Sequence, residues 1–162
     1  MRPLAEAEFV LHSGIVAWPD GLAKLKAGDE VTWEWIRGHR GNPLNERADQ
    51  LAREARQRLE SGQAVPTAVT TQSTALPEVA LYTQGCALGN PGPGGYAAVI
   101  VDAQGREQPI FGAWPMATSN VMELWAAVAG LQALRQVSHV TVYSTSKYLI
   151  DGAARWLAQW ER

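Results

Sequence analysis

The glycine-rich stretch from Tyr82 to Tyr96, YTQGCALGNPGPGGY, is the first place where residue types and spacing could perform chemistry. Glycine-rich loops bind phosphate through backbone N–H groups when they lead into a helix N-terminus, commonly with a Lys-Ser or Lys-Thr pair. Here an apolar, strand-like run follows, and the stretch contains no such pair. The composition therefore predicts a wide hairpin turn punctuated by Gly and Pro, and not a mononucleotide site.

Three titratable side chains are further candidates, and each also has a simple structural explanation. Glu123 follows Asn120 by three residues, which resembles a capping box at the start of a helix. Asp49 precedes Arg53 by four residues, a spacing that allows an ion pair on one helix face. His39 lies in the polar stretch RGHRGN, where a histidine can bond to the backbone. Taken alone, none of the three indicates a catalytic site.

Hydrophobic patterns before position 61 predict the elements that would position two of these residues. Trp33 and Trp35 alternate with polar residues, as in a half-buried strand. Asn42 followed by Pro43 is typical of a helix N-cap and first helical residue. The predicted elements are a short helix over 20–28, a strand over 30–36 and a helix from 43 to about 59.

Residues 61–77 contain no charged side chain and are rich in Thr, Ser, Ala and Pro, which predicts a linker. The second part of the chain mixes strand and helix patterns, and its first three strands form a meander. This combination indicates an α/β or α+β domain. The predicted elements are strands over 78–83, 95–101 and 106–114, a helix over 122–134, a strand over 138–144 and a helix over 147–160.

Length and composition bound the class of protein. A chain of 162 residues fits one domain with a sizeable core. The net charge of −2 lacks the basic excess of a strong nonspecific nucleic-acid binder. The single cysteine, Cys86, excludes an internal disulfide framework. No apolar run is long enough for a membrane span, and the N-terminus lacks a signal-peptide pattern, so we expect a cytoplasmic protein without membrane association.

Four segments together resemble the type 1 ribonuclease H family. YTQGCALGNPGPGGYAAVI resembles the first hairpin of that family, whose pattern is Y-T-D-G-S-x-x-G-N-P-G-P-G-G. TSNVMELWAAVAGLQAL resembles its first helix, and VTVYSTSKYLIDGAARWLAQW its fourth strand and following helix. VTWEWIRGHRGNPLNERADQLAREA resembles its last strand, active-site loop and final helix. The resemblance implies an α/β fold with a central mixed five-stranded sheet flanked by helices.

The order of these segments differs from the family. Residues 1–60 resemble the C-terminal part of the family, 79–162 its N-terminal part, and 61–78 would be a linker between the two. We therefore expect a single, circularly permuted domain over 1–162, because permutation is tolerated where old termini lie close together. A fragment of a tandem array, with a domain-swapped form, is the alternative, and a monomer is favoured over it.

The resemblance implies cleavage of the RNA strand of RNA/DNA hybrids, with two Mg²⁺ (or Mn²⁺) ions held by four carboxylates. Two of those positions are occupied here by Glu123 and Asp49. The other two are occupied by Gln84 and Thr145, where the family has Asp. His39 matches the loop histidine that the family uses in product release or proton transfer.

Losing two formal charges beside two dications predicts weak or absent metal binding and little hydrolysis. The favoured function is thus a catalytically impaired domain that still binds RNA/DNA hybrid or a related duplex. An active Mg- or Mn-dependent endoribonuclease with neutral ligands at Gln84 and Thr145 is one alternative. A non-catalytic structural or interaction domain without a nucleic-acid role is the other.

Residues for gripping a hybrid are also implied by the resemblance. Lys147 replaces the family's usual Gln, and Thr118 would meet a DNA phosphate. With a reduced basic protrusion, we expect modest, salt-sensitive affinity. The expected nucleic-acid-binding residues are Asn90, Thr118, Ser119, Asn120, Lys147 and Trp156.

Overall fold

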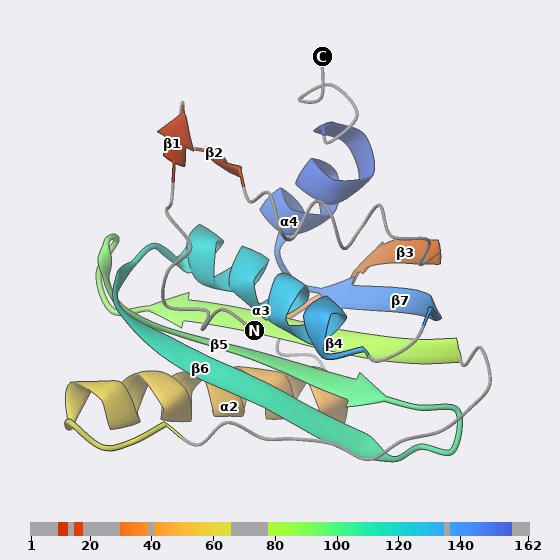
Figure 1. The fold of residues 1–162 in the computed structure, drawn as a ribbon, viewed down its shortest axis with the longest axis horizontal. Helices are drawn as coiled ribbons and strands as arrows, with labels where there is room; N and C mark the ends of the chain where they lie inside the picture. Colours follow the sequence, from red (N-terminus) through yellow and green to blue (C-terminus); the bar gives the residue numbers. More distant parts are fainter. Residues whose placement is uncertain are drawn as a thin grey trace.

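A mixed five-stranded sheet forms the centre of the computed structural model, which describes residues 10–12, 15–17, 30–38, 41–65, 78–134 and 137–156 (Figure 1). The three strands on one side of the sheet run parallel, and the other two are antiparallel to their neighbours. The mixed sheet predicted from the sequence is confirmed. Across the sheet the order is β3 (Glu30–Trp35), β7 (His139–Ser144), β4 (Glu78–Ala87), β5 (Gly92–Val101) and β6 (Glu107–Ala117).

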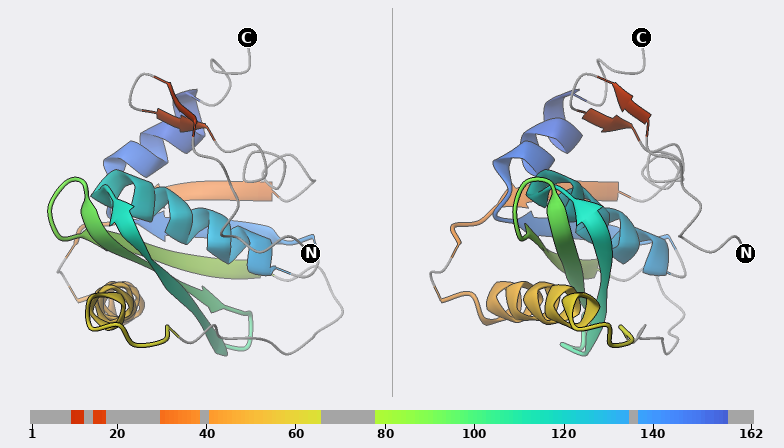
Figure 2. Two further views of the ribbon diagram at one scale, coloured as in Figure 1. Left: turned by 60° about the vertical axis from the view of Figure 1, so that its left-hand side comes forward. Right: turned by 90° about the vertical axis from the view of Figure 1, so that its left-hand side faces the viewer.

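Helices cover both faces of the sheet. Helix α2 (Pro43–Glu60) lies on one face and α3 (Ser119–Ala133) on the other (Figure 2). Helix α4 (Lys147–Asp151) follows β7 and continues as a π-helix, η2 (Gly152–Trp156).

A separate antiparallel pair, β1 (Val10–His12) and β2 (Ile15–Ala17), was not predicted from the sequence. The helix predicted over 20–28 lies outside the described residues.

The main core lies between the sheet and α3. Strand residues such as Leu81, Val140 and Val142 are fully or almost fully buried there, together with Leu131 of the helix. Burial of such side chains stabilises the fold by about 25 cal/mol per Å² of apolar surface. The helix also approaches the sheet closely, since a Cβ on Gly130 would lie 2.6 Å from a methyl carbon of Leu81. A side chain at this glycine would require either Leu81 or helix α3 to shift.

Helix α2 begins and packs as its sequence predicts. The side chain of Asn42 caps it by accepting hydrogen bonds from the N–H groups of Leu44 and Asn45, at 3.2 and 3.1 Å. Its buried face is built of small residues, which allows a close approach to the sheet at Gly95, where an added Cβ would overlap the carbonyl of Ala52. The buried alanines are Ala48, Ala52 and Ala55.

The glycine-rich stretch forms the β4–β5 hairpin, which confirms the turn predicted from its composition. The strands are longer than predicted, because pairing continues from Gln84 opposite Ala97 as far as Ala87 opposite Gly94. The connecting residues are 88–91, and Gly89 adopts a positive φ of 84° that favours glycine.

The predicted capping box of Asn120 and Glu123 is wrong. Helix α3 begins at Ser119, and its N-cap is Thr118, whose hydroxyl accepts a hydrogen bond from the Val121 N–H at 3.2 Å. The cap moves upstream because Thr118 leaves strand β6 in an extended conformation, with φ −96° and ψ 159°. Glu123 is thereby free of a capping role.

Candidate active site at the ends of the parallel strands

The predicted site residues converge where the parallel strands end. Residues Trp35, Ser144 and Thr83 are neighbours in register across β3, β7 and β4. Because the carboxyl ends of parallel strands meet at one edge of a sheet, the residues that follow them lie close together. Gln84 and Thr145 each come directly after this register row.

Gln84 joins the two replaced positions directly. Its Nε2 donates hydrogen bonds to Thr145 Oγ1 at 2.9 Å and to Asn45 Oδ1 of α2 at 3.2 Å. The Gln84 side chain is only 7% exposed, so a hydrogen-bonded amide is far less costly here than an unpaired polar group. Thr145 Oγ1 and Asn45 Oδ1 are thus both acceptors for the same amide group.

Glu123 is brought to the same place by α3. The helix packs onto β4 at Gly85, where an added Cβ would overlap the backbone of Met122 and Glu123. The Glu123 carboxyl accepts hydrogen bonds from the Gly85 N–H and the Ser144 hydroxyl, but its Oε2 is buried without a partner among the described residues.

Burial raises the pKa of Glu123 to about 8, and the nearby charge of Asp49 adds to this effect. The carboxyl is therefore mainly neutral at pH 7.

Asp49 approaches the site from α2 and is engaged by an arginine. Its two oxygens lie 2.8 and 3.3 Å from the Nη2 and Nε atoms of Arg53, one helical turn further on. The ion pair predicted from the i, i+4 spacing is confirmed. Such a two-point contact orients the carboxylate and offsets its charge.

The donor set does not fit a pair of divalent cations. Mg²⁺ sites use carboxylates with well-ordered oxygen geometry. The site has two carboxyl groups. Burial keeps Glu123 mainly neutral, and Asp49 forms an ion pair with Arg53. The other two positions carry the neutral side chains of Gln84 and Thr145, which are hydrogen-bonded to each other. No cluster of three or more His, Cys, Asp or Glu residues with metal-binding geometry occurs in the described part of the chain.

The remaining predicted residues are spread around this site. His39 lies outside the described residues. Asn90 is exposed in the hairpin loop, and Ser119 and Asn120 form the first turn of α3. The Thr118 hydroxyl is occupied as the α3 cap. Trp156 ends the described π-helix, and its side chain is not among the described atoms.

Lys147 is held by an aromatic residue that sequence analysis did not select. Its Nζ lies 5.1 Å from the ring centroid of Trp35, within cation–π range. The indole N–H of Trp35 donates to the carbonyl of Thr145 at 3.0 Å. The only sequence signal was the strand alternation, which predicted a half-buried tryptophan, yet Trp35 is 44% exposed at the sheet edge.

Asn45 and Ser144 were also missed. Asn45 lies three residues after its own N-cap in a helix, and nothing in that position marks it as a partner of Gln84. Ser144 ends β7, where its burial and its contact with Glu123 depend on α3 packing across the strand. Both roles arise between elements that are distant in the sequence.

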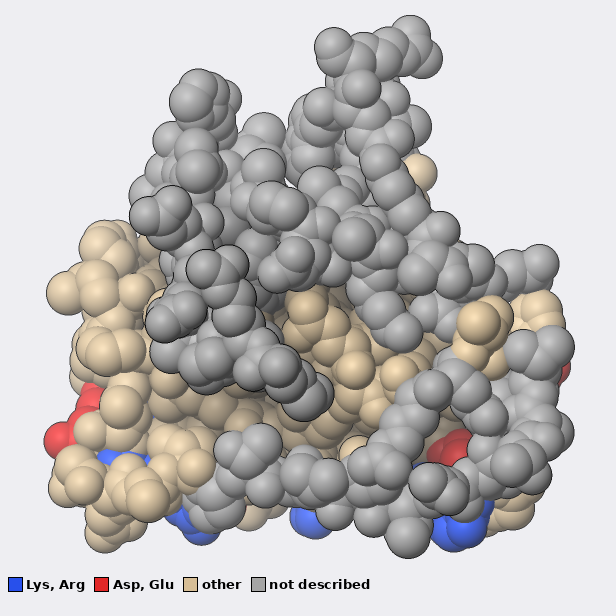
Figure 3. Space-filling view, viewed as in Figure 1, with Lys and Arg blue, Asp and Glu red and all other residues tan. Residues whose placement is uncertain are grey.

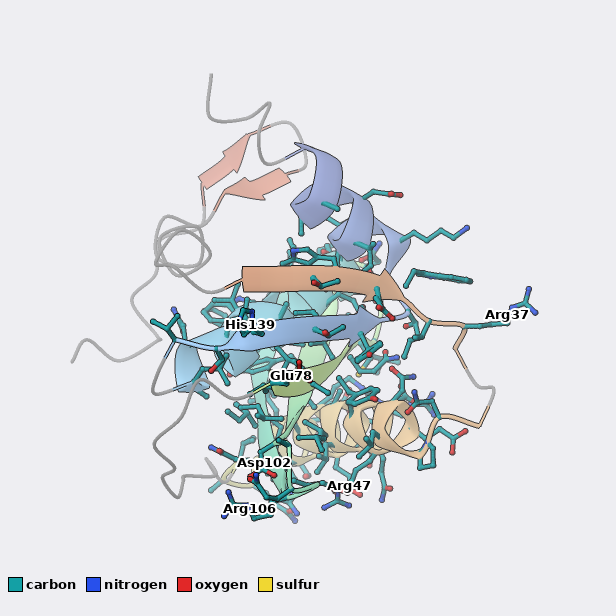
Figure 4. All side chains as sticks on the ribbon, turned by 90° about the vertical axis from the view of Figure 1, so that its right-hand side faces the viewer. Arg37, Arg47, Glu78, Asp102, Arg106 and His139 are labelled. Atoms are coloured by element: carbon teal, nitrogen blue, oxygen red, sulfur yellow. The ribbon has the colours of Figure 1, made fainter. Side chains whose placement is uncertain are left out.

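Most of the arginines with a described contact are paired with acids. In Figure 3 the visible Lys and Arg atoms lie along the lower edge, below the sheet. Figure 4 shows Arg37 pointing away from the body at the end of β3, far from Arg106 and Asp102. The ion pairs are Arg47–Glu107, Arg53–Asp49, Arg56–Glu60 and Arg106–Asp102.

No helix in the described part of the chain is both long and apolar enough to cross a membrane.

The fold is thus a mixed five-stranded sheet with helices on both faces, and two of these helices, α2 and α3, carry the acidic side chains Asp49 and Glu123. The RNase H family model matches residues 16–57 and 77–162, so the chain belongs to the ribonuclease H family.

Individual relatives align over part of the chain. The Ribonuclease H of Tolumonas auensis is 44% identical over 87 residues, which is 54% of this chain and 56% of the relative. That of Syntrophus aciditrophicus is 40% identical over 103 residues, 60% of this chain and 59% of the relative. The chain thus spans a little more than half the length of these relatives.

Solved structures are similar over a comparable part. The N-terminal RNase H domain of Rv2228c from Mycobacterium tuberculosis has 31% identity and a TM-score of 0.45, covering 49% of this chain and 61% of that one. LC11-RNase H1, solved in complex with RNA/DNA hybrid, has 28% identity and a TM-score of 0.42, covering 47% and 60%.

Proposed function

We propose that this chain is a ribonuclease-H-like domain that binds RNA/DNA hybrid or a related duplex and hydrolyses it poorly or not at all. The observation that carries the proposal is the hydrogen bond from Gln84 Nε2 to Thr145 Oγ1, 2.9 Å long. It joins the two positions where the family has Asp, and it replaces two negative charges with one neutral contact. Family membership supports RNA/DNA hybrid as the class of ligand, whereas this hydrogen bond argues against its metal-dependent hydrolysis.

The charge balance supports impaired catalysis. Two-metal hydrolysis needs ions that clamp the attacking water and the leaving oxygen. Of the residues present, only Glu123 and Asp49 bring carboxylates, and burial keeps the first mainly protonated at neutral pH. Removing two charges from such a site costs several kcal/mol of metal binding. We therefore expect weak Mg²⁺ or Mn²⁺ binding and at most trace cleavage.

Hybrid binding is supported by what remains outside the replaced positions. The hairpin that exposes Asn90 and the first turn of α3 keep the polar residues that the family pattern places against a duplex. Lys147 adds an exposed cation beside Thr145. These groups do not depend on the Asp residues that are missing.

Labelled RNA/DNA hybrid, double-stranded DNA and double-stranded RNA, each with the purified chain in Mg²⁺ and in Mn²⁺, test both parts. We expect binding of the hybrid that weakens as salt rises from 50 to 200 mM, as for any ligand held by phosphate contacts, roughly one log unit or more for several contacts. We expect no detectable cleavage product. Cleavage at rates typical of ribonucleases H would establish an active enzyme with neutral ligands. No binding at low salt would leave a structural or interaction role.

The double variant Gln84→Asp/Thr145→Asp sharpens this test. Restoring both carboxylates should produce Mg²⁺-dependent cleavage at least about 100-fold above the unmodified chain, because charge opposite the metals is what the site lacks. The matched control is Gln84→Asn/Thr145→Ser, which changes the same positions without adding charge. Equal activity of the two double variants would contradict the assignment of these positions.

We also propose that the domain is circularly permuted and monomeric. Strand β3 belongs to the segment that resembles the family's last strand, yet it is the first strand of the five-stranded sheet along the chain, and it pairs at the edge beside β7. The alignment of about 87 residues with the relative from Tolumonas auensis is as long as the second matched segment, 77–162, which a permuted order would produce. Light scattering should give a concentration-independent monomer, whereas a dimer would indicate swapping of the segment that carries β3.

A further inference from the structure

We propose that this domain holds the phosphate backbone of its nucleic-acid ligand without a divalent cation, through Lys147 seated on Trp35. The inference rests on the hybrid binding proposed above and adds how the charge of the backbone is met. The side chains at the site do not fit a pair of divalent cations, so the charge of the backbone needs another partner. In place of two of the family's carboxylates this chain has the hydrogen-bonded side chains of Gln84 and Thr145, and Lys147, two residues after Thr145, lies over the Trp35 ring.

The neutral site lets a phosphate approach. In a site with four ionised carboxylates, a phosphate is repelled unless metal ions intervene. Here Gln84 and Thr145 are neutral and hydrogen-bonded to each other. Glu123 is 8% exposed, so its carboxyl has little contact with a ligand that approaches from solvent. The charge of Asp49 is offset by Arg53 at 2.8 Å.

A continuous set of contacts links the cation to this site. Lys147 Nζ lies over the Trp35 ring, at 5.1 Å from its centroid. The Trp35 indole N–H is fixed to the Thr145 carbonyl at 3.0 Å, and the Thr145 hydroxyl accepts from Gln84. The backbone of Gly38, in the loop after β3, also lies against Thr145, where an added Cβ would be 3.5 Å from Thr145 Cγ2. Trp35 therefore contacts both the Lys147 ammonium and the backbone of Thr145, one of the two replaced positions.

Lys147 differs from the arginines described above in its partner. Those arginines meet carboxylates, which use up their donors and offset their charge. Among the described residues, Lys147 meets an aromatic face instead. A cation–π contact restrains the ammonium but leaves its N–H groups able to donate to phosphate oxygens. The exposed part of the indole adds an apolar surface against which a sugar can pack.

Hybrid binding by the unmodified chain, measured in 5 mM Mg²⁺ and in EDTA over a salt series, tests the metal independence. We expect affinities within about threefold of each other at matched ionic strength, because no phosphate contact passes through a metal. Binding that requires Mg²⁺ would overturn this inference while leaving the proposed hybrid binding intact. No binding in either condition would overturn the proposed function and this inference with it.

Variants at the pair test the residues. In EDTA, Lys147→Gln should lower affinity about three- to tenfold and reduce the slope of log K against log salt by about 1, as expected for one lost phosphate contact. Lys147→Arg should retain both values. Trp35→Leu should lower affinity while leaving the charge in place. The matched control is Arg106→Gln, which removes the same charge at the distant β5–β6 turn.

Thermal unfolding of each variant separates loss of contact from loss of fold, and the salt slope is a readout that a merely structural role would not change. If Lys147→Gln and Arg106→Gln change the salt slope equally, Lys147 has no special role and the assignment is overturned. A Lys147→Gln slope that matches the unmodified chain overturns it as well.

Discussion

The core beneath α3 and the site at the strand ends lie on the same strands, yet they follow opposite rules. In the core, Leu81 and Val142 are fully buried among other apolar side chains. A few residues after Leu81 and Val142 along the chain, Gln84 and Thr145 instead form a hydrogen bond between polar side chains. The core is held by apolar packing, whereas the site is held by hydrogen bonds between neutral polar side chains.

This difference teaches that the fold does not require carboxylates at positions 84 and 145, where Gln and Thr stand. Four ionised carboxylates in one buried site repel each other and are costly without metal. Replacing two by a hydrogen-bonded amide and hydroxyl removes that cost, and the surrounding packing can persist unchanged. The apolar core and the polar network therefore use separate residues, and substitutions can be chosen to affect one and not the other.

The largest effect is expected from Leu81→Ala in the core. Truncating a fully buried leucine leaves a cavity against α3 and should lower the free energy of unfolding by about 2–5 kcal/mol. Urea unfolding followed by circular dichroism measures it. Leu88→Ala is the matched control, because Leu88 is 59% exposed in the hairpin loop and its loss should cost less than about 0.5 kcal/mol. Similar costs at both positions would contradict the distinction between the buried core and the exposed hairpin loop.

The next effect is a pH dependence that belongs to Glu123. Burial raises its pKa to about 8 from an ordinary value of 4.5. Between these two values the folded state binds more protons than the unfolded state, so its stability falls as pH rises, by up to about 1.4 kcal/mol per pH unit.

Unfolding free energies from pH 5 to pH 8 should therefore drop by about 3 kcal/mol more for the unmodified chain than for Glu123→Gln, which does not titrate. Guanidinium titrations at closely spaced pH values provide the measurement. Parallel pH profiles for the two proteins would mean that Glu123 is ionised in the folded state at neutral pH, and the site would then be more acidic than described.

A smaller change in stability is expected from Gln84→Asp/Thr145→Asp in EDTA. Two new charges beside Asp49 should lower the free energy of unfolding by about 1–3 kcal/mol, because they replace a satisfied hydrogen bond with repulsion. Mg²⁺ should restore part of the loss by binding the folded state. Gln63→Asp, on an exposed residue after α2, is the control for added charge alone. A double variant as stable as the unmodified chain in EDTA would show that the carboxylates are tolerated without metal.

Much of the fold could be predicted from local pattern. Asn42 and Pro43 indicated the start of α2, and the glycine-rich stretch indicated a hairpin, since both features act within a few residues. The capping box at Asn120 failed because the choice between two nearby caps depends on where the preceding strand ends, which no local pattern fixes. The β1–β2 pair was missed because its strands are only three residues long.

For the site, the sequence by itself determined that two uncharged residues, Gln84 and Thr145, stand where the resemblance to the family places Asp. Only the tertiary structure decided what those residues do instead. The bond between Gln84 and Thr145 spans 61 positions in the sequence, and the contact of Lys147 with Trp35 joins α4 to the edge strand β3. Such contacts follow from strand register and helix packing, because side chains that are distant in the sequence come together only when the sheet and its helices have assembled.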